Sequence, residues 1–225
     1  MTRRTLASML LLSLTPACAT VQPMTPTRAV PPIVQTGAQV LRAPAQAVPP
    51  ERIATPEFQS LLATMFETMR AAPGVGLAAP QIGVPWQVLV LEDPEALFST
   101  LSGAELAERE RVAVAPRVFI NPKLTPIDDE KVTFFEGCLS VSGFAGLVER
   151  WREVEVSGLD EHGAMQRWRV KGWPARILQH EVDHLNGTLY IDRMVTRSFS
   201  TLAQVKARFA GKSMTEVRAL LGLGP

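Results

Sequence analysis

Two histidines that lie four residues apart constrain this chain more than any other feature of its sequence. His180 and His184 enclose an acid in the segment His180-Glu181-Val182-Asp183-His184. Residues four apart share one face of an α-helix, so both imidazoles can reach one metal ion. Glu181 is then close enough to a water on that metal to act as a general base. The alternative is a pair of helix-surface histidines, but the chain has only 3 histidines and two have this spacing.

A metal centre of this kind needs a further ligand, because catalytic zinc and iron sites usually have three protein ligands and one open position. No histidine follows His184, whereas Cys138 stands upstream in the segment Glu136-Gly137-Cys138-Leu139-Ser140. A thiolate binds these metals strongly. The other cysteine, Cys18, lies in a leader-like segment, so we do not expect a disulfide between the two. The predicted ligands are therefore Cys138, His180 and His184.

Such a centre suits the hydrolysis of a carbonyl compound. A bound metal lowers the pKa of its water, and Glu181 can take a proton and hand it to a leaving amine. The oxyanion formed by attack on a carbonyl needs hydrogen-bond donors around it. Gln81 is a candidate donor at the end of the Gly- and Ala-rich run from Gly74 to Gln81. A phosphate loop is disfavoured there, because no Lys or Thr follows in the needed register.

Helices and strands are mixed along the chain without regular alternation, which predicts the α+β class. A helix is expected from Thr55-Pro56 to Pro73-Gly74, where a capping hydroxyl precedes a proline and one apolar stripe follows. A second helix should run from Gly172 to about Asn186 and a short one should begin at Ser213. Strands are predicted at residues 87–92, 117–120, 132–135, 153–159 and 165–170, with a hairpin turn at 160–163, a surface excursion at 94–112 and a loop at 142–146.

The chain length of 225 residues favours one domain with a substantial core, which we place at residues 55–225. Residues 24–54 are rich in proline and should form an extended segment wrapped on that domain. A net charge of +1 argues against a general nucleic-acid binder. No stretch of about 18 apolar residues is present, so no ordinary spanning helix is expected.

Residues 1–23 have a pattern of their own. Arg3 and Arg4 precede an apolar run from Leu6 to Leu14, and small residues follow around Cys18. This resembles a bacterial signal peptide or a lipoprotein leader. The alternative is a mis-assigned start, with Met24 as the first residue. The sequence leaves both interpretations open, and either one excludes residues 1–23 from the fold.

Three segments together resemble the signature of the peptide deformylase family. They are Gly74 to Gln81, Glu136 to Ser140, and Gln179 to Gly187, in the family's order and at similar spacings. The resemblance extends from about Ile33 to Met194. It implies antiparallel sheets around a central metal-bearing helix. It also implies hydrolysis of the formyl group from N-formyl-methionyl peptides, which are nascent chains at or near the ribosome.

The resemblance also implies a role for each matching residue. Cys138, His180 and His184 would hold one divalent metal, which is natively iron(II) in the family, with zinc, nickel or cobalt as alternatives. Glu181 would be the catalytic acid and base. Gln81 and the backbone N–H of Leu139 would polarise the formyl oxygen, and Gln179 would support the site. The residues expected to bind substrate, including the pocket for methionine, are Val75, Gly76, Ile177 and Glu136.

Some positions depart from the family pattern. Ser142 stands where many bacterial members have proline, and the stretch Gly143 to Gly146 lacks an arginine that some members offer to the peptide beyond methionine. This stretch is closer to the organelle-type deformylases, so the peptide preference stays open. A monomer in the cytoplasm is expected from the function, with export or membrane anchoring through residues 1–23 as the alternative. Two other functions remain in view: a different metallohydrolase such as a peptidase, or an exported binding protein without turnover.

Overall fold

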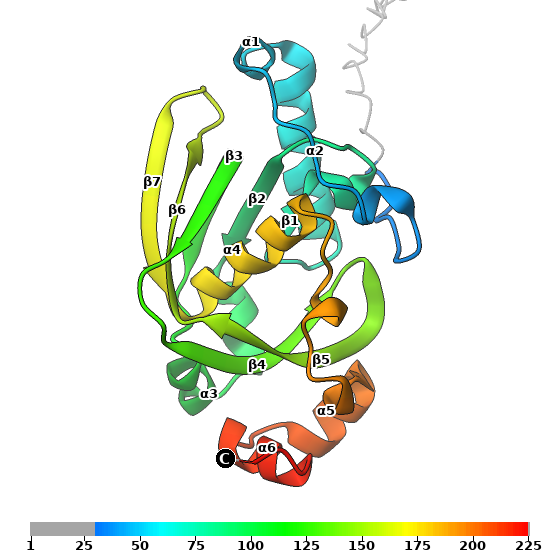
Figure 1. The fold of residues 1–225 in the computed structure, drawn as a ribbon, viewed down its shortest axis with the longest axis vertical. Helices are drawn as coiled ribbons and strands as arrows, with labels where there is room; N and C mark the ends of the chain where they lie inside the picture. The colour runs from blue at the N-terminus through cyan, green and yellow to red at the C-terminus, as the bar shows by residue number, and fades with distance from the viewer. Residues whose placement is uncertain (1–29, 225) are drawn as a thin grey trace, which may run out of the picture.

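The computed structural model describes residues 30–224, so the leader-like segment 1–23 and Met24 lie outside the described residues. Within that range, two antiparallel sheets surround one central helix, α4 (Gly172–Leu185) (Figure 1). The predicted α+β class, with antiparallel sheets around a central helix, is therefore confirmed. Among the described residues, no helix is long and apolar enough to cross a membrane.

The larger sheet has five strands in the order β1-β2-β3-β6-β7. Their bounds are β1 (Gly76–Ala78), β2 (Val88–Asp93), β3 (Val114–Pro126), β6 (Glu153–Leu159) and β7 (Met165–Lys171). The β6–β7 hairpin turns at residues 160–163, as predicted. Asp160 accepts hydrogen bonds from the N–H groups of His162 and Ala164, and Gly163 has a φ of 81°.

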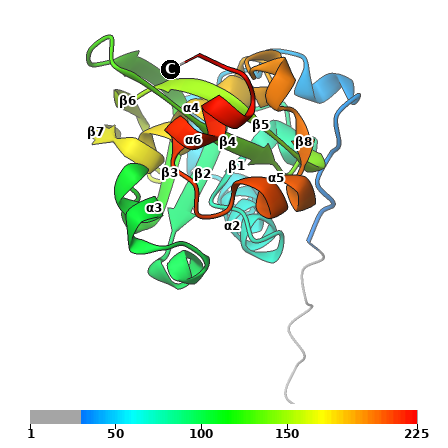
Figure 2. The ribbon, with the colours of Figure 1, turned by 90° about the horizontal axis from the view of Figure 1, so that it is seen from below.

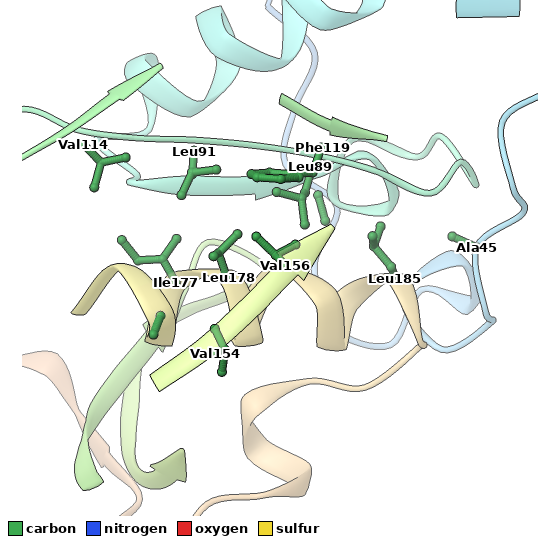
Figure 3. Packing of buried hydrophobic residues seen from close by; sticks show 12 residues of the cluster. Ala45, Leu89, Leu91, Val114, Phe119, Val154, Val156, Ile177, Leu178 and Leu185 are labelled. Carbon is green, nitrogen blue, oxygen red and sulfur yellow. The ribbon is translucent and has the colours of Figure 1, made fainter. Parts of the chain in front are cut away.

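The middle of this sheet is apolar on both faces because a helix packs on each of them. On β2, Leu89 and Leu91 point towards α4, together with residues of β3 and β6 (Figure 3). The alternate residues Val88 and Val90 pack instead against α2 (Pro56–Ala71). Successive side chains of a strand point to opposite faces, so a helix on each face requires a continuous apolar run. The side chain of Thr55 caps α2 as predicted.

The smaller sheet has the order β4-β5-β8, with β4 (Lys131–Cys138), β5 (Val141–Trp151) and β8 (Ser200–Thr201). The two-residue turn Leu139-Ser140 joins β4 to β5. The loop predicted at residues 142–146 is wrong, because these residues belong to β5. Residues 142–144 bulge away from β4, and Phe144 pairs with Thr201 of β8 instead. The glycine-rich stretch indicated a loop because its partner strand, β8, lies far along the chain and has no local signal.

Two short helices near the C-terminus, α5 (Leu202–Phe209) and α6 (Met214–Leu220), lie below the small sheet (Figures 1 and 2). The predicted capping box at Ser213 starts α6, whereas α5 was not predicted. Phe209 of α5 and Val217 of α6 pack on Leu147 of β5. Residues 94–112 form the expected surface excursion, with η3 (Glu95–Thr100) and α3 (Gly103–Glu108).

The segment before α2 lies against the domain in a mostly extended form, interrupted by η1 (Gln39–Leu41) and a helix that was not predicted, α1 (Pro50–Ile53). The N–H of Val34 donates to the carbonyl of Gln81 at 2.8 Å, and the N–H of Thr36 donates to the carbonyl of Ser140 at 2.8 Å. The remaining short turns are η2 (Ala79–Ile82), η4 (Tyr190–Asp192) and η5 (Thr196–Ser198). The segment before α2 therefore contacts η2, which carries Gln81, and the turn that carries Leu139.

Candidate metal centre

The three predicted metal ligands lie together. Cys138 is the last residue of β4, and His180 and His184 lie one turn apart on α4. One ligand atom from each side chain lies within 4.8 Å of the other two. The Sγ atom of Cys138 is 3.3 Å from Nε2 of His184. A sulfur and two imidazole nitrogens form a donor set that suits zinc, iron or cobalt.

The electrostatics of the centre also fit a cation. Burial and the neighbouring His180 lower the pKa of His184 well below its ordinary value, so its ring is neutral and keeps a lone pair for a ligand bond. Burial would lower the pKa of His180 too, but Cys138 and Glu136 raise it well above its ordinary value. Cys138 and Glu136 therefore stabilise a positive charge beside His180, whereas the buried ring of His184 stays neutral.

Glu136 holds the outer nitrogen of His180. Its Oε2 atom lies 2.9 Å from Nδ1 of His180, so Nε2 is left for a metal. Arg150 donates to both oxygens of the same carboxylate at 2.9 Å, and Arg176 donates to Oε1 at 2.6 Å. Burial alone would raise the pKa of Glu136, but Arg150 and His180 outweigh it and hold the pKa far below its usual range.

A series of ion pairs leads from the Glu136 carboxylate to the surface. Arg150 also pairs with Asp183 on α4, and Arg193 donates to both oxygens of Asp183 at 2.8 Å. These partners were not predicted from the sequence. Arg176 could have been found, because it lies four residues before His180 on the same face of the predicted helix. Arg150 offered no such signal, since it approaches from β5.

Glu181 follows the predicted ligand His180 on α4, and one of its carboxylate oxygens makes no hydrogen bond. Its side chain is buried, and Oε2 has no hydrogen-bond partner in the structure. Burial raises the pKa of this carboxyl to about 7. Gly76 of β1 makes room for it, because a Cβ on Gly76 would lie 2.3 Å from Oε1 of Glu181. The predicted acid and base is therefore held in a dry position where it can exchange a proton.

Gln81 is fixed so that its amide group faces the thiol. Its Oε1 atom accepts a hydrogen bond from the N–H of Ala78 at 2.8 Å. That bond directs Nε2 towards Cys138 Sγ at 3.7 Å and Ser140 Oγ at 3.4 Å. Gln179 lies elsewhere, since its amide binds the backbone N–H and carbonyl of Trp151 and so ties α4 to β5.

A cavity of about 330 Å³ opens beside the centre. All four residues predicted to bind substrate line it, as do Gln81, Leu139, Cys138, His180 and Glu181. Glu136 contributes to the lining although His180, Arg150 and Arg176 occupy its oxygens. Lining residues that sequence analysis missed include Phe135, Phe144, Trp173, Arg176 and Leu202.

An α+β fold that places a thiol, an imidazole and a buried acid in one cavity, with a second imidazole next to the thiol, is that of a metal-dependent hydrolase. The family model described as Polypeptide deformylase matches residues 30–199. The chain belongs to this family.

Relatives from plants and animals agree with this assignment. The chain is 48% identical to Peptide deformylase 1A, chloroplastic, of Solanum lycopersicum over 175 residues, which cover 78% of this chain and 63% of the relative. It is 45% identical to Peptide deformylase, mitochondrial, of Homo sapiens over 77% of this chain and 72% of the relative. The match thus spans less than two thirds of the tomato protein.

Solved structures give the same result. The fold is similar to a class I type b peptide deformylase from Acinetobacter baumannii with bound Met-Ala-Ser. The TM-score is 0.65 and the identity is 32%, and the match covers 74% of this chain and 99% of that chain. It is also similar to the peptide deformylase of Ehrlichia chaffeensis, with a TM-score of 0.63, an identity of 36%, and coverage of 73% of this chain and 88% of that chain.

Proposed function

We propose that this protein is a peptide deformylase. It hydrolyses the formyl amide at the N-terminal methionine of newly made polypeptides and releases formate. The observation that carries this proposal is the composition of one cavity. Cys138, His180, Glu181 and Gln81 meet there with an apolar lining that can take an unbranched side chain. The resemblance of three ordered motifs and the family membership point to the same reaction.

Cys138, His180 and His184 hold the metal in this proposal, with iron(II) as the native ion and zinc, nickel or cobalt as replacements. When bound, such an ion makes a water nucleophilic near neutral pH and polarises a carbonyl. Glu136 keeps the His180 ring in one orientation through Nδ1. The buried charges behind it, Arg150 and Asp183, fix α4 against β5.

Glu181 moves the proton. Its carboxylate takes a proton from the attacking water, the water oxygen bonds to the formyl carbon, and the C–N bond breaks. The same carboxyl then gives its proton to the nitrogen of methionine, which leaves as an amine. Nε2 of Gln81 and the N–H of Leu139 donate hydrogen bonds to the formyl oxygen while its negative charge develops. Burial keeps bulk water away from Glu181 during both transfers.

The methionine side chain enters the apolar part of the cavity. Val75 and Ile177 form its walls, and Gly76 lies beside Val75 in the lining. The Acinetobacter baumannii structure holds Met-Ala-Ser, a peptide that begins with methionine, which supports the same class of ligand here.

The natural substrates in this proposal are nascent chains at the ribosome, and the enzyme acts as a monomer in the compartment where those chains are made. Residues 55–225 are its catalytic domain in this proposal, and the described part of the preceding segment, residues 30–54, lies along that domain. A cytoplasmic enzyme follows from this substrate, and an exported or anchored form through residues 1–23 is the alternative.

Formate release from formyl-Met-Ala-Ser tests the proposal. The protein is purified without oxygen, loaded with iron(II), and compared with the same protein after chelation. We expect formate and free Met-Ala-Ser from the loaded protein alone. Release of methionine from unformylated Met-Ala-Ser would indicate a peptidase, and no turnover of either peptide by a protein that holds one metal would indicate a binding protein.

A further inference from the structure

The mouth of the cavity differs in chemistry from its interior. Three lining residues carry a carboxylate or a guanidinium, namely Glu136, Arg176 and Glu181, and all three are buried. The exposed residues of the lining are Pro73, Gly137, Phe144 and Leu202, and none has a polar side chain. Exposed apolar side chains that gather at the mouth of a cavity indicate a binding surface.

The segment after η5 contributes Leu202 to this mouth and packs on Phe144. Phe144 on β5 pairs with Thr201 of β8 through the backbone, and its ring stacks on Phe199 at a centroid distance of 5.0 Å and an angle of 11°. Leu202 follows Thr201 directly and leans over β4, because a Cβ on Gly137 would lie 3.9 Å from its Cδ2 atom. Phe144, Phe199 and Leu202 remain 39%, 42% and 52% exposed.

A folded protein does not gain stability from leaving such side chains in water, so a function is the better explanation of their position. Leu202 also lies beyond Phe199, the last residue that the family model matches. Leu202 is thus distinct from the predicted metal ligands and from the walls around methionine, which all lie within the matched residues.

We propose that Phe144 and Leu202 bind an apolar side chain of the substrate at one of the two positions after methionine. The proposal rests on the proposed function, because the formyl group then lies at Glu181 and the peptide leaves through the mouth. Each extended residue advances the chain by about 3.3 to 3.6 Å, so the next side chains pass this edge. A charged side chain would lose water there and gain no partner among the lining residues that face solvent.

The test compares rates on peptides that differ at one position. Formyl-Met-Leu-Ala and formyl-Met-Ala-Leu are measured against the same peptides with Lys in place of Leu. We expect kcat/KM to be about tenfold higher for a Leu peptide than for its Lys counterpart, since an open apolar edge discriminates less than a closed pocket. In Leu202→Gln this ratio should fall by about three- to tenfold.

Three further variants separate binding from a structural role. Leu220→Gln changes a leucine that is 54% exposed on α6 and lies outside the cavity lining, so the ratio should not change. Leu202→Met should keep most of the preference, because the side chain stays apolar. Leu202→Glu should reverse it by raising the rate on the Lys peptide relative to the Leu peptide.

Equal rates on the Leu and Lys peptides, or an unchanged ratio in Leu202→Gln, would overturn this proposal while formate release still supported the deformylase. Absence of formate from every peptide, including formyl-Met-Ala-Ser, would overturn the proposed function and this proposal together. Thermal unfolding of each variant shows whether it is folded, and the reversal in Leu202→Glu cannot arise from partial unfolding.

Discussion

Gly76 and Glu181 fit against each other with no room for another carbon atom. A Cβ on Gly76 would lie 2.3 Å from Oε1 and 2.8 Å from Cδ of Glu181. The two residues are far apart in sequence and belong to β1 and α4, which are neighbours in the fold. Gly76, in the first of the three family-like segments, is therefore required by the side chain of Glu181, in the third.

Gly76→Ala should lower kcat/KM for formate release by at least about 100-fold, because the carboxylate must move out of its position and small misplacements of a catalytic group are costly. Overpacking should also cost about 1–3 kcal/mol of unfolding free energy. The control is Gly103→Ala, since a Cβ there meets nothing within 4 Å. Equal activity of Gly76→Ala and Gly103→Ala would contradict a close contact between Gly76 and the Glu181 carboxylate.

Glu181→Gln should lower kcat by about 10²- to 10⁴-fold, because the amide cannot accept and return the proton. Metal content, measured by plasma emission spectrometry, should stay at that of the unchanged protein. Glu57→Gln on the exposed start of α2 is the control and should be fully active. Full activity in Glu181→Gln would exclude the proposed proton transfer.

Cys138→Ala should bind metal much more weakly, because one of the three ligand atoms that lie within 4.8 Å of one another is lost. The measurement is the metal retained after dialysis against a weak chelator. Cys138→Asp, which restores an anionic ligand, should retain more than the alanine variant. Metal content equal to that of the unchanged protein would show that the ligand set is different and would favour another metallohydrolase.

Arg150→Met should lower the free energy of unfolding by about 3–5 kcal/mol, because Glu136 and Asp183 would be left as buried charges with fewer partners. Urea titration measures this change. Arg167 is the matched control: its side chain is 73% exposed and its distance to Glu155 is 3.6 Å. Arg167→Met should therefore change stability by less than about 1 kcal/mol.

Gln35→Leu should lower kcat by about tenfold, with a smaller change in KM. Nε2 of Gln35 donates to the carbonyl of Leu139 at 3.0 Å, and Oε1 accepts from the N–H of Ser142 at 3.3 Å. Both bonds fix the turn that carries Leu139 and follows Cys138, and a displacement of that turn misplaces an oxyanion donor.

The control for this variant is Gln59→Leu. Nε2 of Gln59 also donates to two carbonyls, those of Ile53 and Glu161, away from the cavity. Gln59→Leu should lower stability and leave kcat unchanged. An equal loss of kcat in both glutamine variants would show that the effect of Gln35 is general destabilisation.

Local chemistry made several elements predictable from sequence. The hydroxyl of Thr55 and the proline after it mark the start of α2, and the spacing of His180 and His184 identifies α4. The turn with Asp160 and Gly163 was recognisable for the same reason. Each of these signals lies within a few residues of the structure that it produces.

Contacts between distant segments were not predictable in this way. Phe144 lies in a strand because Thr201 pairs with it, and Arg150 meets Glu136 and Asp183 only after β4, β5 and α4 have packed. The residues of the centre were found because they carry distinctive chemistry. Leu202 was missed because an exposed leucine at the start of a short helix has no local signal for a cavity.

The interior and the mouth of the cavity come from different parts of the chain. The interior is formed by segments inside residues 30–199, which the family model matches, whereas Leu202 at the mouth comes from the segment after them. An inhibitor confined to the interior would contact only residues that the family model spans. A compound extended by an apolar group over Leu202 would distinguish this protein from relatives that differ there, and selective inhibitors should be sought at the mouth.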